Sequence, residues 1–210
     1  MKKKTLTKLR TLHSWVFTIL AIALIASAFT GCSSDIVTEE TTELVDETIS
    51  TLIEPDSANE SEIDTSSLTT GQKNALESAE SYLSFTAFSY EGLIGQLEFE
   101  GYSTEDATFA ADNCGADWNE QALLSAQSYL EFTAFSYDGL IDQLEFEKFT
   151  LEQATYAADN CGADWNEQAA KSAESYLEFS SFSRDGLIEQ LVFEGFTYEQ
   201  AEYGVEANGY

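Results

Sequence analysis

The stretch SAESYLSFTAFSYEGLIGQLEFEGYSTEDATFAADNCGADWNEQ (78–121) returns 47 residues later as SAQSYLEFTAFSYDGLIDQLEFEKFTLEQATYAADNCGADWNEQ (125–168). A third copy, SAESYLEFSSFSRDGLIEQLVFEGFTYEQAEYGVEANGY, occupies residues 172–210 and stops two residues before the position of the repeat's tryptophan. Self-similarity at a fixed period is the signature of a repeat architecture. The sequence therefore predicts three repeats, over residues 71–118, 119–165 and 166–210, of which the last is truncated.

Each copy contains three helical patterns, which the second copy illustrates. A helix is expected near residues 120–132, a second after Ser136 as its N-cap, and a third from the capping box Thr150-Leu-Glu-Gln153 to a stop at Gly162. The residues expected to face inward are Ala122, Ala126, Tyr129 and Leu130, then Leu140, Ile141 and Leu144, then Ala154, Ala157, Ala158 and Cys161. The repeat contains no strand-like alternation, so the predicted fold class is all-α, with about 47 residues and three short helices in each repeat.

The first 31 residues have the parts of an export signal. MKKKTLTKLR (1–10) is basic, and WVFTILAIALIASAF (15–29) is apolar. As a helix that run would be about 22 Å long, which is short for a bilayer core of about 30 Å. It leads into Thr30-Gly31-Cys32, which resembles a bacterial lipobox with Phe29 where leucine is usual. The resemblance implies cleavage between Gly31 and Cys32 and acylation of Cys32, which would attach the mature protein to the membrane. The alternatives are an ordinary signal peptide with an incidental cysteine, or an uncleaved anchor.

Residues 33–70 are rich in serine, threonine and acids, with one proline and no aromatic residue. Their scattered apolar side chains are too sparse to bury a core, so residues 32–70 are predicted to form a disordered tether behind the lipidated cysteine. A flexible coil of this length would span roughly 30–35 Å, and repulsion between its acids would extend it.

Charge separates the leader from the rest of the chain. The sequence has 9 basic and 38 acidic residues, but five of the bases lie within residues 1–10, so residues 32–210 carry a net charge of −34. A surface of that sign repels phosphate backbones and argues against nucleic-acid binding. The only histidine, His13, also lies in the leader. Histidine-based triads and HExxH zinc sites are therefore excluded from the remaining chain.

The repeat motifs SAxSYLxF, FSxxGLIxQLxFE and AxYAADNCGADWNEQA resemble those of the Ltp-type host cell surface-exposed lipoproteins, which occur in Gram-positive bacteria and their prophages. The resemblance covers about residues 70–210. It implies small helical repeats with helix-turn-helix-like geometry, displayed from the outer face of the cytoplasmic membrane into the cell wall. Some phage-encoded members of the family cause superinfection exclusion, in which a resident prophage blocks DNA entry by later phages.

The two cysteines of the repeats occupy equivalent positions, Cys114 and Cys161, and Asn208 takes that position in the third copy. Equivalent core positions are not expected to bring their Cα atoms within the roughly 7 Å that a disulfide requires. We therefore interpret both cysteines as small buried residues of the third helix. The acidic segment 112–117 does not match a calcium loop, because Cys114 and Ala116 stand at ligand positions, so no metal site is expected.

The aromatic residues of the repeats mostly recur at positions expected to be core. Trp118 and Trp165 occur once per junction and are interpreted as repeat-junction packing residues. Tyr90 and Tyr137, whose counterpart in the third copy is Arg184, are candidates for exposed contacts with a partner.

The sequence offers little for catalysis. The acidic pairs Glu98/Glu100 and Glu145/Glu147 have the residue type of glycosidase sites, but in so acidic a repeat we interpret them as a solvated face. No GxSxG, P-loop or dinucleotide motif is present. The prediction is therefore no enzyme, no cofactor and no small-molecule substrate.

The leading hypothesis is a surface lipoprotein that works by protein binding and excludes superinfecting phage by blocking injection of their DNA. A basic phage tail or tape-measure-type protein is the expected partner, since a −34 head attracts positive charge. The alternative is a structural or interaction lipoprotein of the cell envelope without a phage role.

Overall fold

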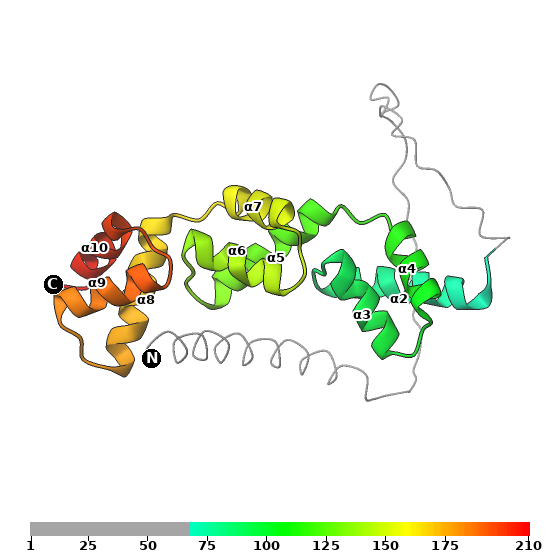
Figure 1. The fold of residues 1–210 in the computed structure, drawn as a ribbon, viewed down its shortest axis with the longest axis horizontal. Helices are drawn as coiled ribbons and strands as arrows, with labels where there is room; N and C mark the ends of the chain where they lie inside the picture. Colours follow the sequence, from blue (N-terminus) through cyan, green and yellow to red (C-terminus); the bar gives the residue numbers. More distant parts are fainter. Residues whose placement is uncertain (1–67) are drawn as a thin grey trace, which may run out of the picture. The chain divides into compact units, whose positions relative to one another are not determined.

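The computed structural model describes residues 68–210, and this part of the chain is helical, without a strand (Figure 1). The predicted signal peptide, the lipidation site Cys32 and the predicted tether up to residue 67 lie outside the described residues. The described helices are α2 (Thr70–Phe85), α3 (Tyr90–Phe99), α4 (Thr104–Asn113), α5 (Trp118–Phe132), α6 (Tyr137–Phe146), α7 (Leu151–Asn160), α8 (Trp165–Phe179), α9 (Arg184–Phe193) and α10 (Tyr198–Ala207).

The helices form three successive groups of three, which are α2–α4, α5–α7 and α8–α10. Each group has a hydrophobic core of its own, and within each group the first and third helices pack together most extensively. The predicted all-α fold of repeated three-helix units is therefore confirmed.

The helix starts follow from the side chains that precede them. Ser136 Oγ accepts a hydrogen bond from the Gly139 backbone N–H at 3.0 Å, which caps α6. Thr150 and Gln153 form the reciprocal capping box at the start of α7. Both were expected from the sequence, because a side-chain oxygen at these positions satisfies backbone N–H groups that have no partner within the helix. All nine described helices begin at such a cap, with Thr69, Ser89, Ser103, Asp117, Ser136, Thr150, Asp164, Ser183 and Thr197 in turn.

Leucine and alanine fill the cores. In the middle group Leu140 and Leu144 of α6 are fully buried, as the helical spacing predicted. The small side chains of Ala122, Ala126 and Ala154 are also fully buried, so α5 and α7 approach closely. Removal of apolar surface from water is the main source of stability for each unit.

The third group is packed more tightly at one point. Gly204 of α10 stands where Ala157 stands in α7. A Cβ atom at Gly204 would lie 2.6 Å from the backbone carbonyl atoms of Ala169 in α8. The absence of a side chain there therefore permits the close contact between α8 and α10.

Candidate interaction surface

The two repeat tryptophans lie where one helical group meets the next. Trp118 is the first residue of α5, yet its side chain is half-buried against the core of α2–α4. Its ring meets that of Tyr90 edge to face, with the centroids 5.4 Å apart. Trp165 and Tyr137 repeat this contact at the second junction, also at 5.4 Å. Edge-to-face aromatic contacts of this kind are favourable beyond the area that they bury.

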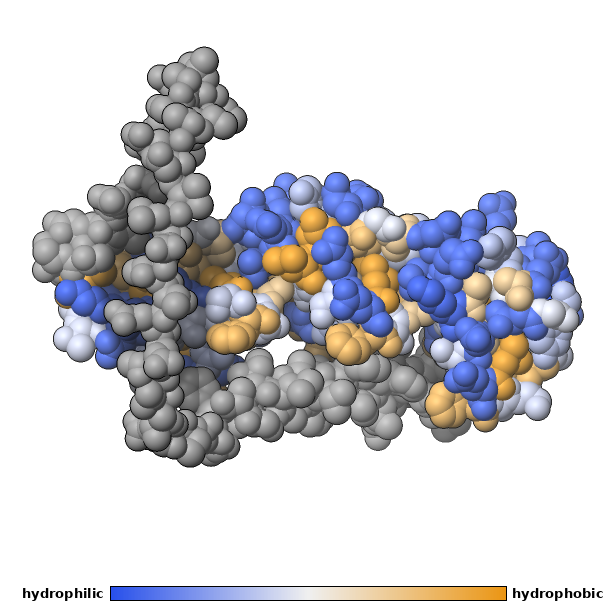
Figure 2. Space-filling model, turned by 180° about the vertical axis from the view of Figure 1, so that it is seen from behind, coloured by the Kyte–Doolittle hydropathy of each residue, from blue (hydrophilic) through white to orange (hydrophobic). Residues whose placement is uncertain are grey.

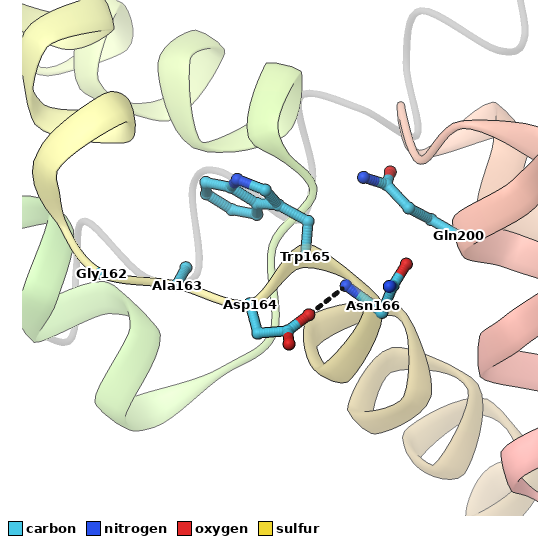
Figure 3. Close-up of a pocket in the computed structure, with 6 residues that line it drawn as sticks. All are labelled: Gly162, Ala163, Asp164, Trp165, Asn166 and Gln200. Carbon is cyan, nitrogen blue, oxygen red and sulfur yellow. Dashed lines mark hydrogen bonds between the residues drawn. The ribbon is translucent and has the colours of Figure 1, made fainter.

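Figure 3 shows the second junction in close-up. Gly162 and Ala163 lead from α7 to Asp164, whose carboxylate accepts the backbone N–H of Asn166 at 2.9 Å and caps α8. Trp165 follows directly, and Gln200 of α10 lies on the other side of a shallow hollow lined by these residues. The hollow is open and holds no buried polar group that would bind a small ligand.

A hydrogen bond also crosses each junction. Ser89 Oγ, which caps α3, donates to the Glu147 carbonyl oxygen at 2.5 Å. Ser136 Oγ donates to the Glu194 carbonyl oxygen at 2.5 Å in the same way. The same serine hydroxyl therefore starts a helix in one repeat and contacts the end of a helix in the next.

Tyr90 and Tyr137 differ from the sequence expectation. We expected them to be exposed partner contacts, but they are half-buried because their rings pack against Trp118 and Trp165. Their hydroxyls donate to carboxylate oxygens of the third helix, Tyr90 to Asp112 and Tyr137 to Asp159, each at 2.7 Å. The pattern within one repeat could not show that the tryptophan at the start of the next helical group packs against each of these tyrosines.

The third repeat has different chemistry at the position of these tyrosines. Arg184 stands at the position of Tyr90 and Tyr137, and its guanidinium forms ion pairs with Glu202 at 2.9 Å and Glu206 at 3.1 Å. No tryptophan follows it in the sequence.

The acidic pairs do not all form the solvated face that the sequence suggested. Glu98, Glu100 and Glu145 are exposed, but Glu147 is largely buried. Its carboxylate accepts hydrogen bonds from the hydroxyls of Tyr129 and, at 3.2 Å, Ser125. Burial raises the pKa of Glu147 to about 7, and the Ser125 hydrogen bond only partly opposes that shift. The expectation was wrong for Glu147 because the spacing of two carboxylates does not reveal what packs over them.

Glu194, the counterpart of Glu147 in the third repeat, has the equivalent hydrogen-bond partners. Glu194 accepts from the hydroxyls of Tyr176 and, at 3.1 Å, Ser172. Burial and the contact with the Glu194 carboxylate raise the pKa of Tyr176. These groups hold the end of the second helix against the first helix of the same repeat and form no exposed catalytic pair.

The remaining surface is strongly acidic. Residues 68–210 contain 27 acidic and four basic residues, which gives a net charge of −23. Figure 2 shows extensive hydrophilic surface over the helices, interrupted by hydrophobic patches.

Several of the aromatic residues expected in the core are exposed instead. Phe85, Phe132 and Phe179, the last residues of α2, α5 and α8, are 87%, 81% and 90% exposed. Their positions at helix ends, followed by extended backbone, place them outside the cores. Sequence reasoning missed them because the recurrence of an aromatic residue was interpreted as burial.

Cys114 and Cys161 are free thiols and half-buried. They pack against the cores of the first and second groups, and burial raises the pKa of the Cys114 thiol. Within residues 68–210, no group of three or more His, Cys, Asp or Glu side chains is placed to hold a metal ion. None of the helices described there is both long and apolar enough to cross a membrane.

These features describe an all-helical repeat protein with an acidic surface. The model of the host cell surface-exposed lipoprotein family, Ltp, matches the chain three times, at residues 70–114, 117–161 and 164–207. Together these matches cover more than half of the chain, and the protein belongs to that family.

One solved structure is also similar in sequence. It is that of Ltp, a superinfection exclusion protein from the Streptococcus thermophilus temperate phage TP-J34. The two chains are 38% identical over a match that covers 44% of this chain and 97% of that one, with a TM-score of 0.43. No curated protein matches the chain.

Proposed function

We propose that this protein is a lipid-anchored surface protein that excludes superinfecting phage by blocking the injection of their DNA. The observation that carries the proposal is the combination of three copies of the Ltp-family repeat with a net charge of −23 on the helical unit. Ltp of phage TP-J34 is described as a superinfection exclusion protein, and we extend that role to this chain.

The proposed anchor is a lipid on Cys32, exposed by cleavage after Gly31. The acidic segment up to residue 70 would then act as a tether between the outer face of the cytoplasmic membrane and the repeats in the cell wall of a Gram-positive host. Such attachment raises the effective concentration of the repeats where phage DNA must cross the membrane.

The proposed partner is a basic phage protein released during injection, such as a tail or tape-measure-type protein. Acidic repeats attract a positively charged chain and speed its encounter with the surface. The same charge disfavours DNA itself as the ligand. Binding should weaken as salt is added, because exposed charges are screened over about 10 Å at 0.1 M ionic strength.

The alternative is a structural or interaction lipoprotein of the envelope without a phage role. The description of the matching family supports this alternative, since it names a surface-exposed lipoprotein and no phage. Plaque formation on a susceptible Gram-positive host that expresses the gene separates the two. Exclusion predicts fewer plaques at unchanged adsorption, whereas unchanged plaque counts across a broad phage panel would favour the envelope role.

A further inference from the structure

Within residues 68–210, Lys148 is the one residue other than glycine that adopts a left-handed backbone, with a φ of 72°. It follows the end of α6, where its N–H donates to the Glu145 carbonyl oxygen at 2.9 Å. Helices commonly end with glycine at such a position, because glycine has no Cβ atom to strain. The equivalent residues of the other repeats are indeed glycines, Gly101 and Gly195. Strain that one repeat retains and the other two avoid points to a role for the lysine side chain.

The side chain of Lys148 reaches from the second repeat to the first. A Cβ atom at Gly95 of α3 would lie 3.7 Å from Lys148 Nζ, so the ammonium group lies beside the α3 backbone. The equivalent positions in the other repeats are Asp142 and Glu189, so Gly95 is also peculiar to this junction. Glycine is unfavourable inside a helix, just as lysine is unfavourable at a left-handed position. Two residues that go against local preference therefore meet across the same junction.

The second junction is built differently at the same place. A Cβ atom at Gly195 would lie 2.8 Å from Ser136 Oγ, so a side chain fits there only if its neighbours shift. The first junction is slightly wider, since a Cβ atom at Gly92 would lie 3.7 Å from the Glu147 carbonyl oxygen, against 3.4 Å at the equivalent place in the second junction. The two junctions share their aromatic and serine contacts but differ in whether a lysine side chain crosses them.

The face of α3 that meets Lys148 is acidic. Glu91 and Glu98 lie about one turn before and after Gly95 and share its face of the helix, and both are exposed. No direct ion pair joins Lys148 to either of these carboxylates in the described structure, so the attraction acts across solvent and is open to screening by salt. In the second junction the three equivalent positions of α6 are all acidic, and Gly195 stands in place of the lysine.

We propose that Lys148 is an electrostatic latch, which holds the second repeat to the first through the acids of α3. The left-handed strain is retained because glycine at this position would remove the cation from the junction. The second junction depends instead on its aromatic and hydrogen-bond contacts. The inference goes beyond the proposed function and involves no phage partner, since it concerns how the two junctions of one chain respond to salt.

Each junction contains a backbone amide that reports whether it is closed. The Phe88 N–H donates to Gln121 Oε1 across the first junction at 3.4 Å, and the Phe135 N–H donates to Gln168 Oε1 across the second at the same distance. Opening of a junction breaks this hydrogen bond and lets the amide exchange with solvent. Exchange at Phe88 therefore reports on the latch, and exchange at Phe135 is a control within the same molecule.

The test measures amide hydrogen exchange at single-residue resolution, on the full-length lipoprotein in nanodiscs of zwitterionic lipid and at constant pH. Lys148→Met removes the charge but keeps an unbranched side chain at the left-handed position. Lys171→Met is the matched control, because it makes the same change of charge at an exposed lysine of α8 in the third repeat. Thermal unfolding of each variant checks that the repeats remain folded.

We expect Phe88 to exchange about two- to fivefold faster in Lys148→Met than in the wild type, which is the range that an exposed charge interaction supplies. Phe135 should keep its wild-type rate in this variant, and Phe88 should keep its rate in Lys171→Met. Salt at about 1 M, where screening acts over about 3 Å, should bring wild-type Phe88 to the rate of Lys148→Met. Unchanged exchange at Phe88 in Lys148→Met, or a wild-type rate at Phe88 that does not respond to salt, would overturn the inference.

Lys148→Gly separates a latch from a lysine that is merely tolerated at this position. Glycine relieves the left-handed strain, so a tolerated lysine predicts unchanged or slower exchange at Phe88 in this variant. A latch predicts faster exchange at Phe88 than in the wild type, even though the backbone is then unstrained. Unchanged or slower exchange at Phe88 in Lys148→Gly would therefore overturn the inference as well.

Discussion

At the residue scale, Glu147 shows how the repeat uses an acidic side chain in a structural role. Its carboxylate lies between Tyr129 and Ser125, while its backbone carbonyl accepts the hydrogen bond from Ser89 of the preceding repeat. Burial raises the pKa of this carboxyl to about 7 from an ordinary value of 4.5, although the hydrogen bond from Ser125 opposes that shift. Stability should therefore depend on pH at this position.

The folded state holds the Glu147 proton more tightly than the unfolded state, so the free energy of unfolding should fall as pH rises from about 4.5 to about 7. The loss would be about 2–4 kcal/mol for a shift of this size. Glu147→Gln should remove this slope and stabilise the protein at pH 7.5. Chemical denaturation at several pH values measures the free energy of unfolding and its pH dependence. Glu145→Gln is the control, because Glu145 is exposed. Equal slopes for the two variants would contradict the assignment.

Trp118 is the second residue with a testable role. Trp118→Ala removes an indole that packs against the first core and against Tyr90. Because the ring is half-buried at the junction, we expect a loss of stability of up to the roughly 3–5 kcal/mol that truncation of a fully buried aromatic side chain costs. Thermal unfolding measures the effect, and the exposed Phe132→Ala is a matched control. A near-unchanged melting temperature for Trp118→Ala would make Trp118 a candidate contact residue instead.

At the scale of helices and their packing, most of the fold could be predicted from the repeat itself. Ser136 and the Thr150–Gln153 box identified two helix starts because capping depends on local sequence. The exposure of Phe132 and the burial of Glu147 could not be predicted in this way, because both depend on how a helix end lies against its neighbours. The Trp118–Tyr90 contact likewise joins two repeats, which a pattern within one repeat does not show.

Two glycines within helices should respond in opposite directions. Gly95→Ala in α3 has room for its methyl group, whose nearest neighbour would be Lys148 Nζ at 3.7 Å, and should stabilise by about 0.5–1 kcal/mol through helix propensity. Gly204→Ala gains the same propensity but meets the backbone of Ala169 at 2.6 Å. Overpacking costs about 1–3 kcal/mol, so we expect net destabilisation. Thermal unfolding of both variants decides this, and stabilisation by Gly204→Ala would contradict the close packing of α8 and α10.

At the scale of the whole molecule, the proposed function depends on attachment as well as on charge. Cys32→Ser should remove membrane retention and leave the repeats folded, because it removes the proposed lipid attachment while the cores of the described helices lie within residues 75–205. Labelling of cells with a radioactive fatty acid should mark the wild type alone, and Cys114→Ser should label like the wild type. Equal labelling of the Cys32→Ser protein would contradict the lipoprotein assignment.

The central claim is that the anchored repeats stop phage DNA from entering an adsorbed cell. The most direct measurement is intracellular phage DNA at equal adsorption, in host cells that display the wild type and in cells that express Cys32→Ser, with potassium leakage recorded alongside. We expect adsorption to be unchanged, DNA entry to be blocked by the wild type, and the unanchored protein to inhibit much less because its effective concentration at the membrane is lower. Normal DNA entry across a broad phage panel, with surface display of the wild type confirmed, would contradict the account.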